Sequence, residues 1–142
     1  MILNTRIEDL RRDGAEKCRR FLQACTDAGL DVRLNATKRA RFLQMIYALQ
    51  TFYPLDEINL VRKEFGLWAL TADENTRRAT WTLRSKHCDG LAFDAVVYKD
   101  GLPWWKAPRS VWEQMGTIGE SCGLSWGGRW KNTDCPHFEV EA

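Results

Sequence analysis

The chain has two histidines, and each stands close to an aspartate. His87 precedes Asp94 by seven residues, and His137 follows Asp134 by three. Asp94 lies inside the apolar run 91–97, which has the length and the β-branched content of a buried strand. An ionised carboxylate taken out of water is strongly disfavoured unless a cation or strong donors meet it. Asp94 must therefore either face solvent or meet a positive group.

A zinc ion would provide that positive charge. Zinc accepts imidazole nitrogen and carboxylate oxygen as ligands, and a catalytic zinc site keeps three protein ligands and one open position for water. A turn in the Cys-Asp-Gly segment after His87 would let that side chain and Asp94 converge, and His137 on the final strand could be the third ligand. Asp134, in a loop just before Pro136, would then be free to act as a base.

Two separated segments resemble the motifs of a known family. The run from Ser85 to Asp94, SKHCDGLAFD, resembles the S-x-H-x-x-G-x-A-x-D motif of zinc peptidases of the D-Ala-D-Ala carboxypeptidase and L-alanyl-D-glutamate endopeptidase type. The run from Gly123 to Glu139 is similar to that family's G-L-x-W-G-G-x-W…D-x-P-H-F ending, which is specific to the endopeptidase branch found in many phage endolysins. The resemblance covers residues 85–140 and is loose before them.

The resemblance implies a role for each of these polar residues. It implies that His87, Asp94 and His137 bind zinc and that Asp134 is the catalytic base, a position at which some relatives carry Glu. It also implies the fold, an α+β domain in which a small antiparallel sheet carries the zinc site and helices flank the sheet.

The family also uses an upstream arginine, on an R-[ST]-x-x-x-Q pattern, to steady the substrate carbonyl or the developing oxyanion. The run from Arg39 to Gln44 keeps the Arg-to-Gln spacing but has Ala40 where Ser or Thr is usual. We assign this role to Arg39, although Lys38 and Arg41 lie close enough to compete for it. The alternative is that Arg39 is an exposed charge on a helix.

The cysteines offer a different zinc site. Their number, five, is odd and no two of them have C-x-x-C spacing, which favours reduced thiols over a disulfide framework. Cys88 and Cys135 flank the histidines and could join Cys122 in a structural Cys/His cluster, but their spacing fits no zinc-finger template.

Glu139 is a rival for the role of base. It shares a strand face with His137 by the alternation of side chains along a strand, and could replace Asp134 as the base.

Helical periodicity and turn signals predict three helices and three strands. A capping box from Thr5 to Glu8 predicts a helix that ends at Gly29, Thr37 predicts the cap of a second helix that ends at Pro54, and Ser110 predicts the cap of a third that ends near Gly123. Strands are expected at 30–34, 91–97 and 137–140, and residues 54–84 give no clear pattern. We expect one domain over residues 1–142.

Composition limits the remaining possibilities. A net charge of +2 gives no indication of a nucleic-acid partner, and the charged N-terminal segment and the lack of a long apolar span predict neither a signal peptide nor stable membrane insertion. Five of the seven tryptophans follow residue 100, which indicates an aromatic cluster or groove, or simply core.

These observations lead to one expected function. We expect a monomeric zinc endopeptidase that cuts the L-alanyl-D-glutamate bond of peptidoglycan stem peptides, made in the cytosol and released to the cell wall in the manner of a phage endolysin. The alternatives are a D,D- or L,D-carboxypeptidase of cell-wall peptides and a non-catalytic, zinc-stabilised wall-binding module.

Overall fold

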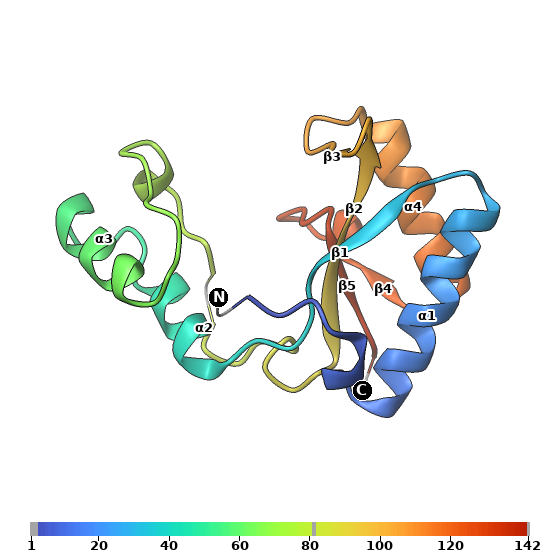
Figure 1. Ribbon diagram of the computed structural model, residues 1–142, viewed down its shortest axis with the longest axis horizontal. Helices are drawn as coiled ribbons and strands as arrows, with labels where there is room; N and C mark the ends of the chain where they lie inside the picture. Colours follow the sequence, from blue (N-terminus) through green and yellow to red (C-terminus); the bar gives the residue numbers. More distant parts are fainter. Residues whose placement is uncertain (1–2, 81, 142) are drawn as a thin grey trace.

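The computed structural model describes residues 3–80 and 82–141. Within these residues, helices α1 (Arg12–Asp27) and α4 (Arg109–Ser121) pack with an antiparallel sheet in one part of the molecule. Helices α2 (Arg41–Ala48) and α3 (Leu55–Glu64) form a second part, on the left in Figure 1. The expected α+β architecture, with a small antiparallel sheet and flanking helices, is confirmed.

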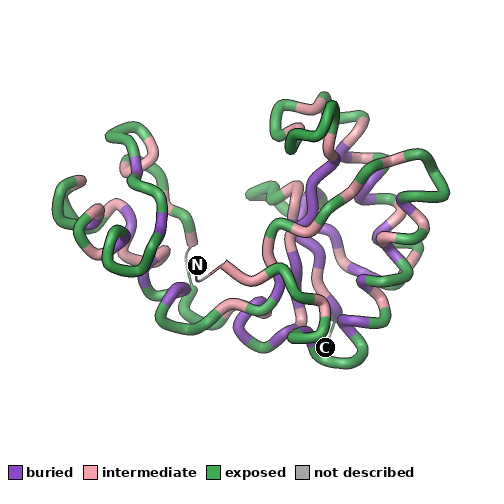
Figure 2. The backbone as a smooth tube through the Cα atoms, in the orientation of Figure 1, coloured by how far each residue is buried: buried purple, intermediate pink, exposed green. Residues whose placement is uncertain are grey.

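The sheet has five strands, all paired antiparallel: β1 (Val32–Ala36), β2 (Ala92–Lys99), β3 (Leu102–Pro103), β4 (Ser125–Trp126) and β5 (His137–Glu139). The strand order is β1-β2-β5-β4, and the short β3 pairs with the end of β2. The central strands β2 and β5 are the most buried in the sheet (Figure 2). They carry Asp94 and His137, so the two residues are fixed by the sheet itself.

The two faces of the central strands have different environments. The rings of Phe93 and Phe138 are cross-strand partners 5.6 Å apart, and both pack against Phe21 of α1. Successive side chains of a strand point to opposite faces. The neighbouring pair, Asp94 and His137, therefore points away from this core, which explains how a carboxylate occurs in an apolar run.

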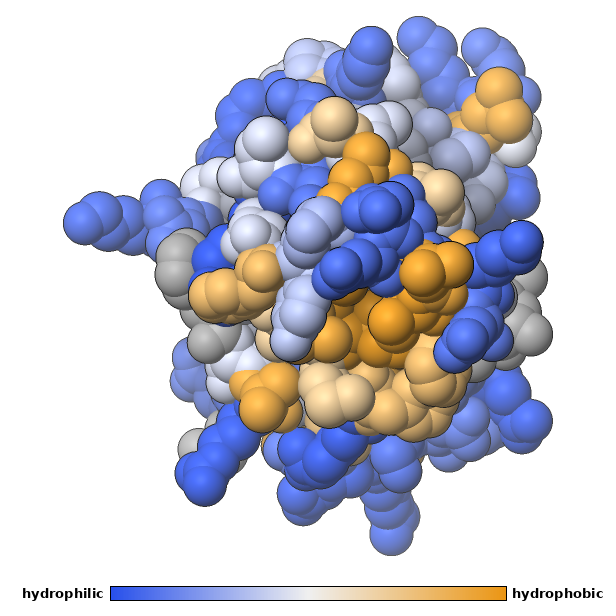
Figure 3. All heavy atoms as spheres, turned by 90° about the vertical axis from the view of Figure 1, so that its left-hand side faces the viewer, coloured by the Kyte–Doolittle hydropathy of each residue, from blue (hydrophilic) through white to orange (hydrophobic). Residues whose placement is uncertain are grey.

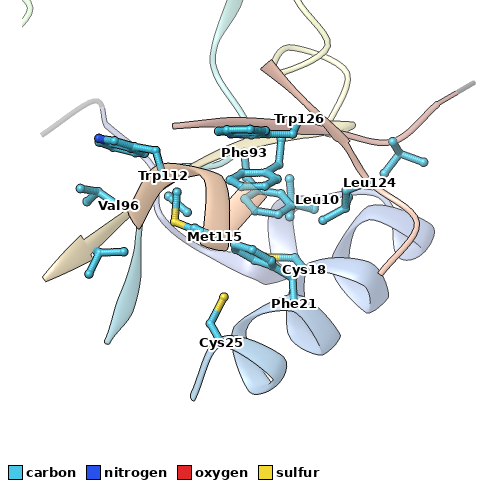
Figure 4. Close-up of a cluster of buried hydrophobic side chains, with 14 of the residues drawn as sticks. Leu10, Cys18, Phe21, Cys25, Phe93, Val96, Trp112, Met115, Leu124 and Trp126 are labelled. Carbon is cyan, nitrogen blue, oxygen red and sulfur yellow. The ribbon is translucent and has the colours of Figure 1, made fainter. Parts of the chain in front are cut away.

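Helices α1 and α4 cover the apolar face of the sheet. The labelled side chains in Figure 4 show this core: Leu10, Cys18, Phe21, Cys25, Phe93, Val96, Trp112, Met115, Leu124 and Trp126. The part of the molecule formed by α2 and α3 has a smaller core of its own, made by Leu43, Ile46 and Leu67. Large aromatic and apolar side chains remain exposed on that part: Phe42, Met45, Phe52, Tyr53, Leu60, Phe65 and Trp68. Figure 3 shows a hydrophobic patch on this side of the molecule.

Three predicted helix starts are wrong. The first helix begins at Arg12, and the segment with the supposed capping box forms a short 3₁₀ turn, Ile7–Asp9, instead. The second helix has Ala40 as its N-cap residue, because Thr37 is fully buried and donates its hydroxyl to the carbonyl oxygen of Asn4. The third begins at Arg109, after Pro108, rather than after Ser110. The first predicted strand lies two residues later than expected, and α3, β3 and β4 were not predicted.

Candidate metal centre and active site

Asp94 and His137 face each other across the β2–β5 pair. The register places them directly opposite, and Asp94 Oδ1 lies 3.5 Å from His137 Nδ1. His87 reaches the same carboxylate oxygen with its Nε2 atom, at 3.2 Å. The ligand atoms of these three residues all lie within 4.8 Å of one another. The structure therefore brings together the three residues for which the sequence predicted zinc binding.

A tight turn positions His87. The Cys88 N–H donates to the Ser85 carbonyl oxygen, and Gly90 then takes a φ of +71°, which favours glycine. A Cβ atom at Gly90 would lie 3.0 Å from the backbone nitrogen of Arg11, so the close approach to the start of α1 also requires glycine. The turn returns the chain into β2 and lets His87 meet Asp94, as the Cys-Asp-Gly sequence indicated.

Hydrogen bonds on the far side of each imidazole select the tautomer that a metal needs. His87 Nδ1 lies 2.9 Å from the Thr37 carbonyl oxygen, which can only accept, so Nδ1 carries a proton and Nε2, on the side of Asp94, is the atom that can bind a metal. His137 Nε2 lies 2.9 Å from Glu139 Oε2, which leaves Nδ1 free in the same way. Metal-binding histidines characteristically donate their other N–H to a carbonyl or carboxylate. The donor set of two imidazoles and one carboxylate fits zinc.

The pKa values of Asp94 and His137 show how strongly the three side chains interact. Burial raises the pKa of Asp94, but hydrogen bonds from His137 and His87 outweigh it and hold that pKa well below its usual range. Burial lowers the pKa of His137, but the carboxylates of Asp94 and Glu139 outweigh this effect and raise it to about 9. The site is therefore built to hold a positive charge, whether a proton or a metal ion.

Asp134 lies at the edge of this cluster. Its Oδ2 is 3.9 Å from His137 Nδ1, and its side chain is 51% exposed. Its backbone is fixed on both sides, because its N–H donates to the Gly127 carbonyl and its own carbonyl accepts from His137. A Cβ atom at Gly127 would lie 2.4 Å from the Asp134 carbonyl oxygen, so only glycine fits there. Partial burial raises the pKa of Asp134, and the nearby carboxylate of Asp94 raises it further.

Arg39 lies beside Asp94 rather than on an exposed helix face. Its Nη2 is 3.9 Å from Asp94 Oδ2, and its Nη1 donates to Gln44 Oε1 at 2.7 Å. Gln44 is buried, and its amide donates in turn to the Thr82 carbonyl oxygen. Arg41 instead forms an exposed ion pair with Asp89 at 2.8 Å. Of these two arginines, Arg39 is the one that the fold places at the cluster.

The cluster opens into a cleft of about 680 Å³ that is lined from both parts of the molecule. Trp105 and Trp130 line this cleft, and the Trp130 ring lies 4.9 Å from the His137 ring. Trp112 and Trp126 belong to the core. The C-terminal tryptophans thus supply both a groove and a core.

The cysteines do not form a second site in the described part of the chain. Residues 3–80 and 82–141 contain one group of three or more metal-binding side chains, and it is His87, Asp94 and His137. Cys88 is buried, and Cys135 Sγ accepts a hydrogen bond from Arg109. The cysteine cluster considered from the sequence therefore has no support in the structure.

We expect Cys18 and Cys25 to resist alkylation in the folded protein. Burial raises the pKa of each thiol to about 12, and the reactive form is the thiolate. Iodoacetamide at neutral pH, followed by peptide mapping, should modify the partly exposed Cys122 and Cys135 first. In denaturant all five cysteines should react alike. Modification of Cys18 as rapid as that of Cys135 in the native protein would contradict the packing described for α1.

Two contributors to the site were not predicted from the sequence. Glu139 was considered as a base, but it accepts from His137 and lies 3.1 Å from Lys86 Nζ, so it acts in the structure as the carboxylate that orients the imidazole. The alternation that places it on the His137 face was the signal for this role. The Thr37 carbonyl had no such signal, because a backbone oxygen is invisible in a sequence pattern.

Comparisons with known proteins support the relationship. Residues 78–140 match the family model described as D-alanyl-D-alanine carboxypeptidase. No curated protein sequence matches the chain. Among solved structures, the L-Ala D-Glu endopeptidase ChiX of Serratia marcescens is 19% identical, with a TM-score of 0.63 over 95% of this chain and 83% of that one.

Two further structures have similar folds. The LD-carboxypeptidase LdcB is 13% identical, with a TM-score of 0.62 over 92% of this chain and 58% of that one. The vancomycin resistance D,D-pentapeptidase VanY, solved as a mutant in complex with Zn(II), is 14% identical, with a TM-score of 0.58 over 92% of this chain and 72% of that one. At these identities the similarity establishes the fold.

Proposed function

Residues 78–140 belong to the D-alanyl-D-alanine carboxypeptidase family of zinc peptidases, and on this premise we propose that the chain is a zinc endopeptidase acting on the L-alanyl-D-glutamate bond of peptidoglycan stem peptides. The observation that carries the proposal is the convergence of His87, Asp94 and His137 at the wall of a cleft, with Asp134 beside them. A purely structural zinc site has no need of the additional carboxylate. Asp134 therefore favours an enzyme over a non-catalytic wall-binding module.

His87, Asp94 and His137 would hold the metal. Zinc in such a site supplies a Lewis acid that acidifies water and polarises a carbonyl group. Thr37 and Glu139 keep both imidazoles in the tautomers described above, so these ligands need no rearrangement to bind.

Asp134 would move the proton. Its half-exposed carboxylate lies next to His137 and borders the cleft, so it can reach both water and a bound peptide. It would accept a proton from the attacking water and return it to the amine that leaves when the peptide bond breaks. The raised pKa of Asp134 favours the first step, because a stronger base accepts the proton more readily.

Arg39 would stabilise the negative charge that develops on the substrate carbonyl oxygen. Its guanidinium lies beside the metal-binding carboxylate and is fixed by Gln44, so it need not move during the reaction. Asp94 compensates its charge in the absence of substrate.

We expect Arg39→Ala to lower turnover by about 10²–10³ while zinc stays bound, because that is the usual cost of losing one oxyanion donor. Arg41→Ala is the matched control, since Arg41 pairs with Asp89 at the surface and should remain close to wild type. Initial rates of fragment release and zinc content should be measured for both variants. Full activity of Arg39→Ala, together with an inactive Arg41→Ala or Lys38→Ala, would show that the oxyanion role was assigned to the wrong cation.

The endopeptidase specificity rests on two observations of different kinds. The G-L-x-W-G-G-x-W…D-x-P-H-F pattern of residues 123–138 is that of the endopeptidase branch, and the cleft is lined by both parts of the molecule. A D,D- or L,D-carboxypeptidase is the second candidate, because the same zinc chemistry serves both reactions and both kinds of enzyme share the fold.

The motif of residues 123–138 also supports a role in phage-mediated lysis of the host wall. No helix among residues 3–80 and 82–141 could cross a bilayer.

Metal removal tests the proposed chemistry. Purified peptidoglycan should gain new α-amino groups when the zinc-loaded protein is added, and a chelator should stop this gain until zinc is restored. Amine labelling of the insoluble wall and of the soluble fraction measures the reaction. A gain that is insensitive to the chelator would refute a zinc-dependent hydrolase.

A further inference from the structure

A second arginine, Arg62, lines the same cleft and forms no ion pair with any residue among 3–80 and 82–141. It comes from α3 and is 1% exposed, and among the fully buried side chains of the described residues it is second in volume to Trp126. Its Nε donates to the Trp68 carbonyl oxygen at 2.8 Å, and its guanidinium carbon lies 4.6 Å from the centre of the Trp68 ring. Its Nη2 atom has no hydrogen-bond partner among the described residues.

In the described part of the chain, no carboxylate forms an ion pair with this guanidinium. Glu74 is close enough to favour its charge, but no ion pair within 4.0 Å is formed between them, and Glu74 Oε1 accepts from the Thr71 N–H instead. A buried charge without a paired anion, with an unsatisfied donor, is destabilising, and such a group in a folded protein calls for an explanation. Stacking on Trp68 accounts for the face of the guanidinium but not for its Nη2 edge.

The position of Arg62 relative to the metal centre suggests that explanation. The guanidinium carbons of Arg39 and Arg62 lie 5.0 Å and 5.9 Å from the centre of one ring, that of Tyr47. Arg62 is thus one aromatic ring beyond the residue that borders Asp94, on the wall formed by α2 and α3. Both arginines line the cleft that holds the metal centre, so a peptide that runs from the metal centre past Arg39 would approach Arg62.

Local structure holds Arg62 in place. The Asn59 side chain donates to and accepts from the backbone of Leu70, at 3.0 and 2.8 Å, which fixes the segment after α3 onto that helix. Trp68 belongs to this segment, but its side chain is 52% exposed. Its indole can therefore rotate away, since side-chain rotamer changes are common on binding, and widen the cleft beside the guanidinium.

We propose that Arg62 binds a carboxylate of the substrate peptide, at a subsite separate from the metal centre. The inference rests on the proposed function for the identity of the ligand. Stem peptides carry several carboxylates: the α-carboxylate of D-glutamate, that of a diaminopimelate side chain where the wall contains it, and the C-terminal carboxylate. The chemistry shared by all three is a carboxylate that accepts from a planar guanidinium.

The test compares the peptide L-Ala-γ-D-Glu-meso-diaminopimelate-D-Ala with three analogues. The first carries a carboxamide at the D-glutamate α-carbon, the second replaces diaminopimelate with L-lysine, and the third has a C-terminal amide. The kcat/KM of each is measured with the zinc-loaded wild type, Arg62→Gln and Arg62→Lys. Arg12→Gln is the control for loss of positive charge, because the Arg12 side chain is 93% exposed on α1.

Wild type should cleave one of the analogues about 10- to 100-fold less efficiently than the parent peptide, mainly through KM, as expected for a charge-assisted hydrogen bond. The ratio of kcat/KM for the parent peptide to kcat/KM for that analogue should fall to near one in Arg62→Gln. It should remain intermediate in Arg62→Lys and stay at the wild-type value in Arg12→Gln. The sensitive analogue identifies the carboxylate. An undiminished ratio in Arg62→Gln would overturn the proposal, and so would an equal loss on all four peptides, which indicates a structural role.

Peptide binding gives a readout that is independent of hydrolysis. The parent peptide should raise the Tm of wild type more than the sensitive analogue does, and this difference should vanish in Arg62→Gln. If no peptide is cleaved but this pattern holds, the proposed hydrolysis fails and the carboxylate subsite stands. A Tm increase that is the same for all peptides and variants would refute the subsite.

Discussion

Replacing His137 with alanine is expected to abolish hydrolysis and to remove zinc from the purified protein. The residue would supply one of three ligands, and its Nδ1 is held toward Asp94 by the bond between Nε2 and Glu139. Without it, His87 and Asp94 remain, too few ligands for a catalytic zinc site. Zinc content by elemental analysis and fragment release from peptidoglycan should fall together.

Glu139→Gln gives a graded control for that experiment. An orienting partner typically contributes about 10–100-fold to metal affinity, so this variant should bind zinc more weakly than wild type but far better than His137→Ala. Competition with a chromogenic chelator ranks the three proteins. If His137→Ala bound zinc as tightly as wild type does, the zinc site would lie elsewhere in the protein.

Asp134→Asn is expected to lose about 10²–10⁴ in rate while zinc stays bound. Asparagine is nearly isosteric with aspartate, and the backbone bonds of residue 134 to Gly127 and His137 do not depend on its side chain. The fold should therefore survive. The amide cannot accept a proton from water, so the general-base contribution is lost. Tm, zinc content and initial rates, measured on the same preparation, separate these effects.

The competing assignment makes Asp134 a ligand and Glu139 the base. It predicts that Asp134→Asn sheds zinc and that Glu139→Gln is an inactive protein that still holds the metal. The contacts favour our assignment, since both Glu139 oxygens are engaged, one with His137 and the other with Lys86. Near-wild-type cleavage by Asp134→Asn would contradict both assignments, because each gives Asp134 an essential role.

The convergence of His87, Asp94 and His137 could be predicted from the sequence because its parts are encoded locally. A strand alternates its faces, so Asp94 after Phe93 and His137 before Phe138 had to leave the core together. The glycine after Asp89 signalled the turn that returns His87 to that strand. The partners of Arg62 could not be predicted, because its contact with Trp68 depends on how the segment after α3 folds back.

The boundaries of the helices were harder to predict, because tertiary contacts overrode local signals. Thr37 has the chemistry of a helix cap, but its hydroxyl and N–H both bond to Asn4, and the helix starts four residues later. Helix α3 was missed although Pro54 precedes it and Asp56 and Glu57 occupy its first turn. It has few apolar residues: Ile58 is the one that is buried and Leu60 is exposed, so the periodic signal of a buried helix face is weak.

Mass spectrometry of the fragments released from purified peptidoglycan tests the central claim most directly. Cleavage of the L-alanyl-D-glutamate bond would leave glycan strands that carry L-alanine alone and would release peptides that begin with D-glutamate bearing a free amino group. We expect these two products from the zinc-loaded protein and neither from Asp134→Asn. Release of single D-alanine residues from otherwise intact stems would contradict the claim in favour of a carboxypeptidase, and the absence of any new fragment would contradict it in favour of a binding module.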